Sequence, residues 1–208
     1  RGLRLPAATI PRLIRVVPLS TFEFISVLMS IVVGLGVTRL LSSASSLVEQ
    51  RASIRWDFLP LMWAVNTLQY LLIYWWVVVG NWRSYTTFAF VDFATLFFYG
   101  VFLYFCASLI LPSRVEAGLD LSARFESIRR PFFIMWLSVV GAEVADSFLK
   151  GTEYVVSQLG PGWVVVNGVV IAGCVAALFV SDRRFQKVFA VLVFLMYATW
   201  TLSMFRSI

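Results

Sequence analysis

The chain of 208 residues contains no histidine. Imidazole side chains ligate haem, copper and many zinc ions, and they are the usual base for a serine nucleophile. Their absence argues against all of these sites. The sequence also lacks a Walker loop, an HExxH helix, a GxSxG elbow and a dinucleotide-binding fingerprint. We therefore expect a protein that is not an enzyme and that uses no cofactor or metal ion.

Charged residues are scarce as well, at 13% of the chain against about 25% in average soluble domains, whereas 60% of the residues are hydrophobic. About 20 consecutive, mostly apolar residues cross the hydrocarbon core of a bilayer as a helix. Six runs of that length are present: 22–45, 58–80, 86–111, 131–149, 162–181 and 185–206. The composition therefore predicts a multi-pass membrane protein.

The fold class follows from the need to satisfy every backbone amide in lipid, where only helices and closed barrels suffice. The alternation typical of an outer-membrane barrel is absent from all six runs. We predict an all-α bundle of about six transmembrane helices at 21–208, preceded by a basic amphipathic arm at 1–20. Pro131 is expected to open the fourth helix, and residues 113–130 to form a turn or short helix on the membrane surface.

The basic residues indicate an orientation. We call the side with the loops after the first, third and fifth runs the loop side, and the side with both termini the terminal side. Ten basic residues fall on the loop side: Arg39, Arg51, Arg55, Arg114, Arg124, Arg129, Arg130, Arg183, Arg184 and Lys187. Three fall on the terminal side, and the arm adds four more, which weakens the contrast. By the positive-inside rule we expect the loop side in the cytoplasm and the termini outside.

Four acidic residues are predicted to lie at the terminal-side level. Glu23 begins the first run, and Asp92 lies about two turns into the third. Glu143 and Asp146 lie in the last two turns of the fourth run, which is antiparallel to the other two. Asn167, early in the fifth run, joins this level. Carboxylates inside a membrane segment are usually paired or functional, so the layer is a candidate ion-binding site.

Two interpretations of this acidic layer stay open. Arg83, Lys150 and Arg206 lie at the same level, and Asp146 stands four residues before Lys150, so a ring of salt bridges explains the acids as well. Glu143 fits that explanation least, because no basic residue lies four positions after it. Two carboxylates that crowd together without enough cations can hold a proton near neutrality, which is the basis of a proton or cation site.

Polar residues in the second and third runs suggest a path toward the acidic layer. Asn66 and Gln69 share a broad face of the second run with two tyrosines, and Tyr99 lies on a polar face of the third. Together with Asn167 these side chains could line a hydrated path. Hydrogen bonds between helices explain them equally well.

Small residues recur at helical spacing in three runs. They are Ser26, Ser30, Gly34 and Thr38 in the first, Ser138, Gly141, Ala142 and Ala145 in the fourth, and Gly168, Ala172 and Ala176 in the fifth. Such stripes allow helix backbones to approach closely. We expect them to pack within the chain, with contact between copies or a pore lining as the alternatives.

Two segments carry a resemblance to known proteins: FEFISVLMSIVVGLGVTRLLSS at 22–43 and WDFLPLMWAVNTLQYLLIYWW at 56–76. They are similar to a group of small, uncharacterised bacterial membrane proteins with several spans. The resemblance covers mainly the first two helices and implies no activity and no functional residue. It does imply a bacterial inner membrane as the location.

The sequence is compatible with two functions. The first is a channel or carrier for protons or small cations, entered through the acidic layer, in which Glu143 and Asp146 hold the ion and Asp92 relays it. The second is a non-catalytic structural or assembly subunit of a larger membrane complex. The expected partners are the lipid bilayer and either further copies of the chain or other membrane subunits. Nucleic acid is not expected, because anionic lipid accounts for the net charge of +6. The carboxylates make transport the preferred interpretation.

Overall fold

The computed structural model describes residues 21–82 and 88–204. Its six long helices are α1 (Thr21–Glu49), α2 (Phe58–Trp82), α3 (Phe90–Ile110), α4 (Leu121–Leu149), α6 (Gly160–Phe179) and α7 (Arg183–Met204). Three short elements are η1 (Arg51–Ser53), α5 (Thr152–Tyr154) and the π-helical η2 (Val155–Leu159). The described part of the chain contains no strand, and the predicted all-α bundle is confirmed. The predicted arm at 1–20 lies outside the described residues.

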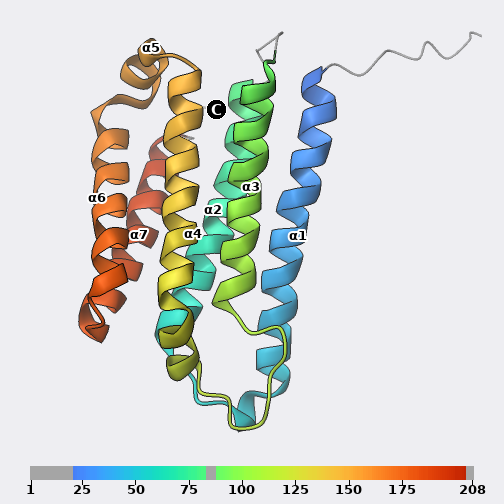
Figure 1. Ribbon diagram of the computed structural model, residues 1–208, viewed down its shortest axis with the longest axis vertical. Helices are drawn as coiled ribbons and strands as arrows, with labels where there is room; N and C mark the ends of the chain where they lie inside the picture. The colour runs from blue at the N-terminus through green and yellow to red at the C-terminus, as the bar shows by residue number, and fades with distance from the viewer. Residues whose placement is uncertain (1–20, 83–87, 205–208) are drawn as a thin grey trace, which may run out of the picture.

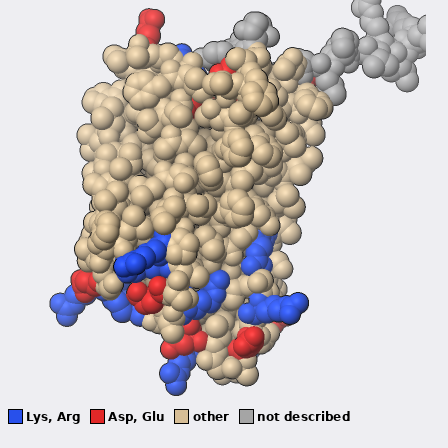
Figure 2. All heavy atoms as spheres, viewed as in Figure 1, with Lys and Arg blue, Asp and Glu red and all other residues tan. Residues whose placement is uncertain are grey.

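The long helices run side by side and alternate in direction along the chain (Figure 1). Five segments are long and apolar enough to cross a membrane: Thr21–Glu49, Phe90–Ile110, Leu121–Leu149, Thr152–Phe179 and Arg183–Ser203. The remaining long helix, α2, has 25 residues and runs alongside them. Charged side chains gather at the loop-side end, and the middle of the visible face is uncharged (Figure 2). The chain is a multi-pass membrane protein, as its composition predicts.

Helix α4 is longer than predicted, because it begins at Leu121 and contains Pro131 in its interior. Asp120 caps its first turn: Oδ1 accepts the backbone N–H groups of Ser122 at 2.8 Å and Ala123 at 3.1 Å. The expectation of a separate surface element before Pro131 is therefore wrong. Proline removes one backbone donor, and the capped first turns continue through it. With 29 residues, α4 is about 43 Å long and exceeds the ~30 Å hydrocarbon core.

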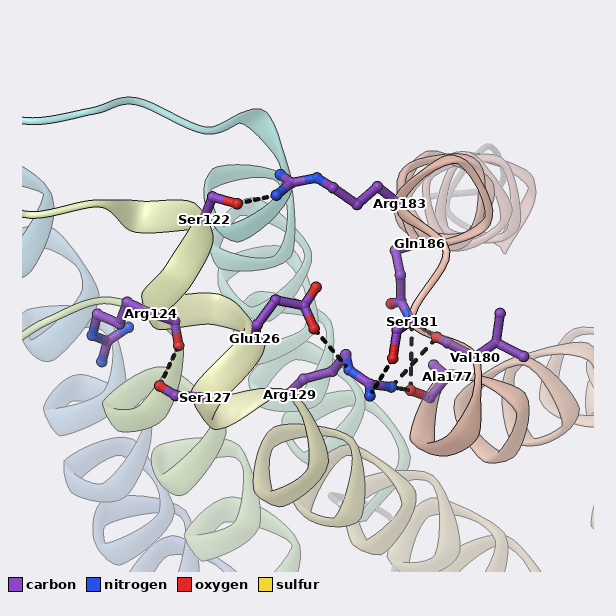
Figure 3. Close-up of polar contacts among 10 residues, drawn as sticks. All are labelled: Ser122, Arg124, Glu126, Ser127, Arg129, Ala177, Val180, Ser181, Arg183 and Gln186. Atoms are coloured by element: carbon purple, nitrogen blue, oxygen red, sulfur yellow. Dashed lines mark hydrogen bonds and ion pairs between the residues drawn. The ribbon is translucent and has the colours of Figure 1, made fainter.

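The loop-side turns of α4 hold the ends of two neighbouring helices. Arg124 donates to two carbonyl oxygens in the last turn of α3, at 2.8 and 2.9 Å. Arg129 donates to the carbonyl oxygen of Ala177 near the end of α6 and to Oγ of Ser181 at 2.9 Å (Figure 3). Helix C-termini leave carbonyl groups without backbone partners, so these two guanidinium groups satisfy them. From the sequence alone, both arginines count only among the ten basic residues of the loop side.

Aromatic rings fill the core between α2, α4 and α7. The indole of Trp63 lies edge-on to the rings of Phe132, Phe133 and Trp136, with centroids 5.1 to 5.4 Å apart. Phe189 of α7 lies 5.6 Å from the same indole. All five side chains are buried, and edge-to-face pairs add stability beyond the burial of their surface. We call these five rings the aromatic cluster.

The stripes of small residues lie mainly on the outside of the bundle. A Cβ added at Gly34, Gly141 or Gly168 would have no atom of another described helix within 4 Å. The expectation that these glycines pack within the chain is therefore wrong. Close helix contacts occur instead at Gly36, where an added Cβ would lie 3.1 Å from Leu71, and at Gly173, where it would overlap the ring of Phe189.

Candidate functional site

A small cavity lies in the terminal-side half of the bundle, between α2, α3, α4, α7 and the α5–η2–α6 segment. Its volume is about 40 Å³. One water needs roughly 10–15 Å³ on this scale, so the cavity has room for a few waters or one small ion. Its wall includes Tyr70, Tyr74, Tyr99, Glu143, Asp146, Lys150, Tyr154, Trp163, Tyr197 and Trp200. The fold thus brings two of the four predicted ion-binding acids into one cavity.

Glu143 is held in the cavity wall by three uncharged donors. From α6, Nε1 of Trp163 donates to Oε1 at 3.0 Å, and Nδ2 of Asn167 donates to the same oxygen at 3.5 Å. The hydroxyl of Tyr70 in α2 donates to Oε2. Glu143 forms no salt bridge with a described lysine or arginine. Within the described structure, hydrogen bonds from neutral groups stabilise this carboxylate.

Asp146 lies one turn further along α4 and is paired with a cation. Nζ of Lys150 lies 2.5 Å from Oδ2, and Nε1 of Trp82 donates to Oδ1 at 3.1 Å. The same Nζ lies 5.0 Å from the centroid of the Trp82 ring and 5.4 Å from that of Tyr154, where ring faces attract a cation. The predicted pair of Asp146 and Lys150 is confirmed. The salt-bridge interpretation therefore holds for Asp146 and leaves Glu143 unexplained.

Two polar atoms beside Glu143 have no hydrogen-bond partner among the described residues. They are the hydroxyl of Tyr197, which lines the cavity, and Oδ1 of Asn167. Tyr197 is 4% exposed and Asn167 is 3% exposed. Buried polar atoms are nearly always satisfied by protein or by ordered water. A water or small cation inside the cavity would satisfy the Tyr197 hydroxyl.

The α5–η2 segment forms the terminal-side part of the wall, through Tyr154 and Leu159. Gly151 and Gly160 flank it with φ of 106° and 67°. Residues with a Cβ rarely adopt these angles, so glycine is required where the chain turns into and out of the segment. Single π-helical turns such as η2 are frequent at functional sites. The wall on this side is thus a short element between two glycine turns.

Asp92 and Glu23 do not line the cavity. Asp92 lies in the first turn of α3, and not two turns into it, because the helix begins only at Phe90. Its Oδ2 accepts the backbone N–H of Ala89 at 2.9 Å, which makes it a helix-capping residue. Glu23 is exposed in the first turn of α1. Both acids stand at helix starts on the terminal side, which agrees with their predicted level in the membrane. They do not belong to the cavity site.

Of the four residues predicted to line a path, two belong to the cavity site and two lie elsewhere. Tyr99 lines the cavity, and Asn167 binds Glu143. The buried amide of Asn66 donates instead to the carbonyl oxygen of Ala190 at 2.9 Å, which joins α2 to α7. Gln69 lines a groove on the outside of the bundle. Neither Asn66 nor Gln69 lines this cavity, so their predicted role does not apply to it.

Sequence reasoning did not connect three residues that define the site with Glu143: Tyr70, Trp163 and Tyr197. Tyr70 lies one turn after Asn66 on a polar helix face, and this spacing was a usable signal. Trp163 has the pattern of an interfacial aromatic residue, and Tyr197 stands in an apolar run. The positions of α6 and α7 in the bundle bring these two side chains to Glu143.

The site has few ligands for a metal. No group of three acidic or cysteine side chains among the described residues is placed to hold one. The cavity wall supplies two carboxylates, of which Asp146 is already paired with Lys150. The chemistry that the wall can offer is therefore proton binding, hydrogen bonding and weak coordination of a small monovalent cation by oxygen.

No family model, curated protein or solved structure matches the chain. The resemblance of its first two helices to small bacterial membrane proteins stays a prediction. The contacts around Glu143 are therefore the basis for assigning a function to the protein.

Proposed function

We propose that the protein is a carrier that moves protons across the membrane and that Glu143 is its proton-binding group. One observation carries the proposal: this half-buried carboxylate is held by Tyr70, Trp163 and Asn167 and has no salt bridge with a described residue. A carboxylate in a membrane span without a counter-ion is expensive, and such residues commonly mark proton relays. Protonation would remove the charge and, with it, the free-energy cost of keeping that charge in the membrane.

The size of the cavity supports a proton or a small cation as the transported species. A volume of about 40 Å³ holds roughly three waters or one small ion. A water between Glu143 and the unpartnered hydroxyl of Tyr197 would extend the hydrogen-bonded chain through the cavity. Asp146 has a different role in this proposal. Its pair with Lys150 positions the end of α4, and Glu143 alone carries the proton.

The aromatic cluster favours a carrier over an open channel. The buried ring of Trp63 lies in the loop-side part of α2, and that of Trp136 lies near the middle of α4, between Trp63 and Tyr70 of the cavity wall. A close-packed aromatic core leaves no standing water path. Transfer from Glu143 to the loop side therefore requires these rings to move, which predicts slow, saturable flux.

We further propose that the loop side faces the cytoplasm of a bacterial inner membrane and that the cavity lies near the outer face. The gathering of Lys and Arg side chains at the loop-side end supports this orientation (Figure 2). Labelling of single cysteines at positions 55 and 153 in whole cells tests it. Reagent that cannot cross the membrane should reach position 153 first.

Proton flux in vesicles tests the function. Purified protein is reconstituted with a pH-sensitive dye inside, and an imposed potential drives protons inward. The wild-type protein should acidify the lumen, and Glu143→Gln should reduce the rate to that of protein-free vesicles. Glu153→Gln is the matched control, since Glu153 is exposed on the same side of the membrane and does not line the cavity. Wild-type flux in Glu143→Gln would refute the proposal.

A structural subunit of a larger complex is the second candidate. It is favoured by the outward position of Gly34, Gly141 and Gly168, which a partner helix could approach closely. Extraction in mild detergent distinguishes the two candidates. A subunit should copurify with a different membrane protein, and it should show no proton flux by itself.

A further inference from the structure

A groove runs along the outside of the bundle between α6 and α7, which lie side by side at its edge (Figure 1), and it reaches the loop-side ends of both helices. Its volume is about 600 Å³. On α6, Ala172, Gly173 and Ala176 contribute only small side chains to it. On α7, Val188 and Leu192 line it and are 68% and 41% exposed. The groove therefore faces the hydrocarbon of the membrane.

The length of the groove matches one leaflet of a bilayer. On α7 it extends from Arg184 to Leu192, which is about 12 Å of helix at 1.5 Å per residue. On α6 it extends from Ala176 back to Val169, about 10 Å. Half of a hydrocarbon core measures about 15 Å. This length suits one acyl chain of the loop-side leaflet, whereas a transmembrane helix of a partner would need a surface about twice as long.

Two side chains of opposite charge stand at the loop-side mouth of the groove: Asp182, just before α7, and Arg184 in its first turn. Both residues are exposed, and neither forms a salt bridge with a described residue. Residues two positions apart do not face each other on a helix, so they do not pair with each other. Arg183 between them differs, because it pairs with Asp57. We call Asp182 and Arg184 the charged mouth.

The carboxylate of Asp182 has room for a further donor, although it caps α7. Its Oδ2 accepts the backbone N–H of Phe185 at 3.1 Å, and its Oδ1 accepts that of Arg184 at 3.4 Å. The two oxygens of a carboxylate offer about four acceptor positions, so about two remain. An ammonium group is a suitable donor for them. A second anion at the mouth would be repelled by the same carboxylate.

We propose that the groove and its charged mouth bind a phospholipid whose headgroup carries both a phosphate and a primary ammonium group, as phosphoethanolamine does. The guanidinium of Arg184 binds the phosphate, the carboxylate of Asp182 accepts from the ammonium, and one acyl chain fills the groove. A purely anionic headgroup would meet the unpaired carboxylate, and a choline headgroup has no N–H to donate. Charge complementarity therefore favours this class of lipid over both others. The site is separate from the cavity around Glu143, which lies in the terminal-side half of the bundle.

Lipid binding to the purified protein tests the headgroup. The protein in detergent is titrated with phosphatidylethanolamine, phosphatidylglycerol or phosphatidylcholine of identical acyl chains, and native mass spectrometry counts the lipids bound. Wild-type protein should bind phosphatidylethanolamine most tightly. Arg184→Gln should weaken that binding roughly 2- to 5-fold, the effect of one partly exposed ion pair. Asp182→Asn keeps a good helix cap but removes the charge, so it should shift the preference to phosphatidylglycerol.

Arg114 and Glu116 provide the matched control for these two substitutions. They are exposed at the same spacing in the connection between α3 and α4, and they do not line the groove. Arg114→Gln and Glu116→Gln should therefore leave the lipid preference unchanged. The proposal would be overturned by wild-type protein that binds the three lipids equally or prefers another of them. It would also be overturned if Asp182→Asn kept the wild-type preference.

A second pair of variants tests the part of the groove that holds the acyl chain. Ala172 is exposed in the groove, so Ala172→Phe fills the space without entering the core and should weaken binding of phosphatidylethanolamine. Ile171→Phe adds a ring at a neighbouring position that is 38% exposed and does not line the groove, and it should have no effect. Binding that is insensitive to Ala172→Phe would overturn the assignment of the groove, whatever the proton flux of the protein.

Discussion

Trp163 donates its indole N–H to Oε1 of Glu143 at 3.0 Å, although the two residues stand on different helices. Asn167, one helical turn later, donates to the same oxygen at 3.5 Å. Two donors at i and i+4 on α6 thus face one acceptor on α4. This contact ties the start of α6, next to the α5–η2 segment, to the acid that we assign to proton binding.

The indole of Trp163 should stabilise the site measurably. Trp163→Phe keeps an aromatic ring but removes the donor, so it should lower the free energy of unfolding by about 1–3 kcal/mol. Unfolding by SDS titration in bicelles measures the change. Trp75→Phe is the control, because that indole is partly exposed and donates to Ser30 on the outside. The loss should shrink when Glu143→Gln is already present; equal losses in both backgrounds would contradict the coupling.

Removing one partner of the buried pair at the end of α4 should lower the free energy of unfolding more than removing both. The side chains of Asp146 and Lys150 are 6% and 1% exposed. Lys150→Met leaves an uncompensated buried carboxylate and should destabilise the protein by about 3–5 kcal/mol. The double variant Asp146→Asn with Lys150→Met should recover much of that loss. A double-mutant cycle on unfolding free energies gives the coupling, and simple additivity would refute this account.

Substitution of two adjacent arginines of α4, Arg129 and Arg130, should have very different effects on the stability of the protein. Arg129 is buried and donates to the end of α6. Arg129→Met leaves Gln186 as the one described side chain that donates to the carbonyl oxygens of Ala177 and Val180, and it should destabilise the protein by about 1–3 kcal/mol. Arg130 is exposed, and Arg130→Met should leave stability nearly unchanged. Hydrogen exchange of the last turn of α6 should rise in the first variant alone. Similar exchange in both variants would show that the arginine is not a cap.

The contact between α6 and α7 depends on a missing side chain at Gly173. Gly173→Ala places a Cβ into the ring of Phe189 and should destabilise by about 1–3 kcal/mol. Gly168→Ala meets open space on the same helix and should be neutral or slightly stabilising. Thermal unfolding in detergent compares the two. Phe189→Leu should partly rescue Gly173→Ala if the ring is the obstacle; without rescue, the strain lies elsewhere.

Helix limits were predictable in part, because they depend on local signals. The start of α2 and the end of α3 before Pro112 agree with the sequence prediction to within a residue or two. The start of α4 differs from the prediction, because the sequence favours Pro131 as a first-turn residue and the helix begins at Leu121. Asp120 immediately precedes it and supplies the N-cap that begins the helix. Proline usually stands in the first turn of a helix, but here the capping hydrogen bonds of Asp120 start the helix ten residues before Pro131.

The sequence by itself determined that this is an all-α membrane protein, that Glu23, Asp92, Glu143 and Asp146 share one side, and that Asp146 and Lys150 pair. These features depend on composition, on the alternation of spans and on i,i+4 geometry, which are local. Only the tertiary structure decided which helix faces point inward. Lipid and protein core are both apolar, so hydropathy does not distinguish them, and the rotation of each helix follows from packing. That rotation placed Tyr70 on Glu143, turned Gln69 outward, and moved the glycine stripes to the surface.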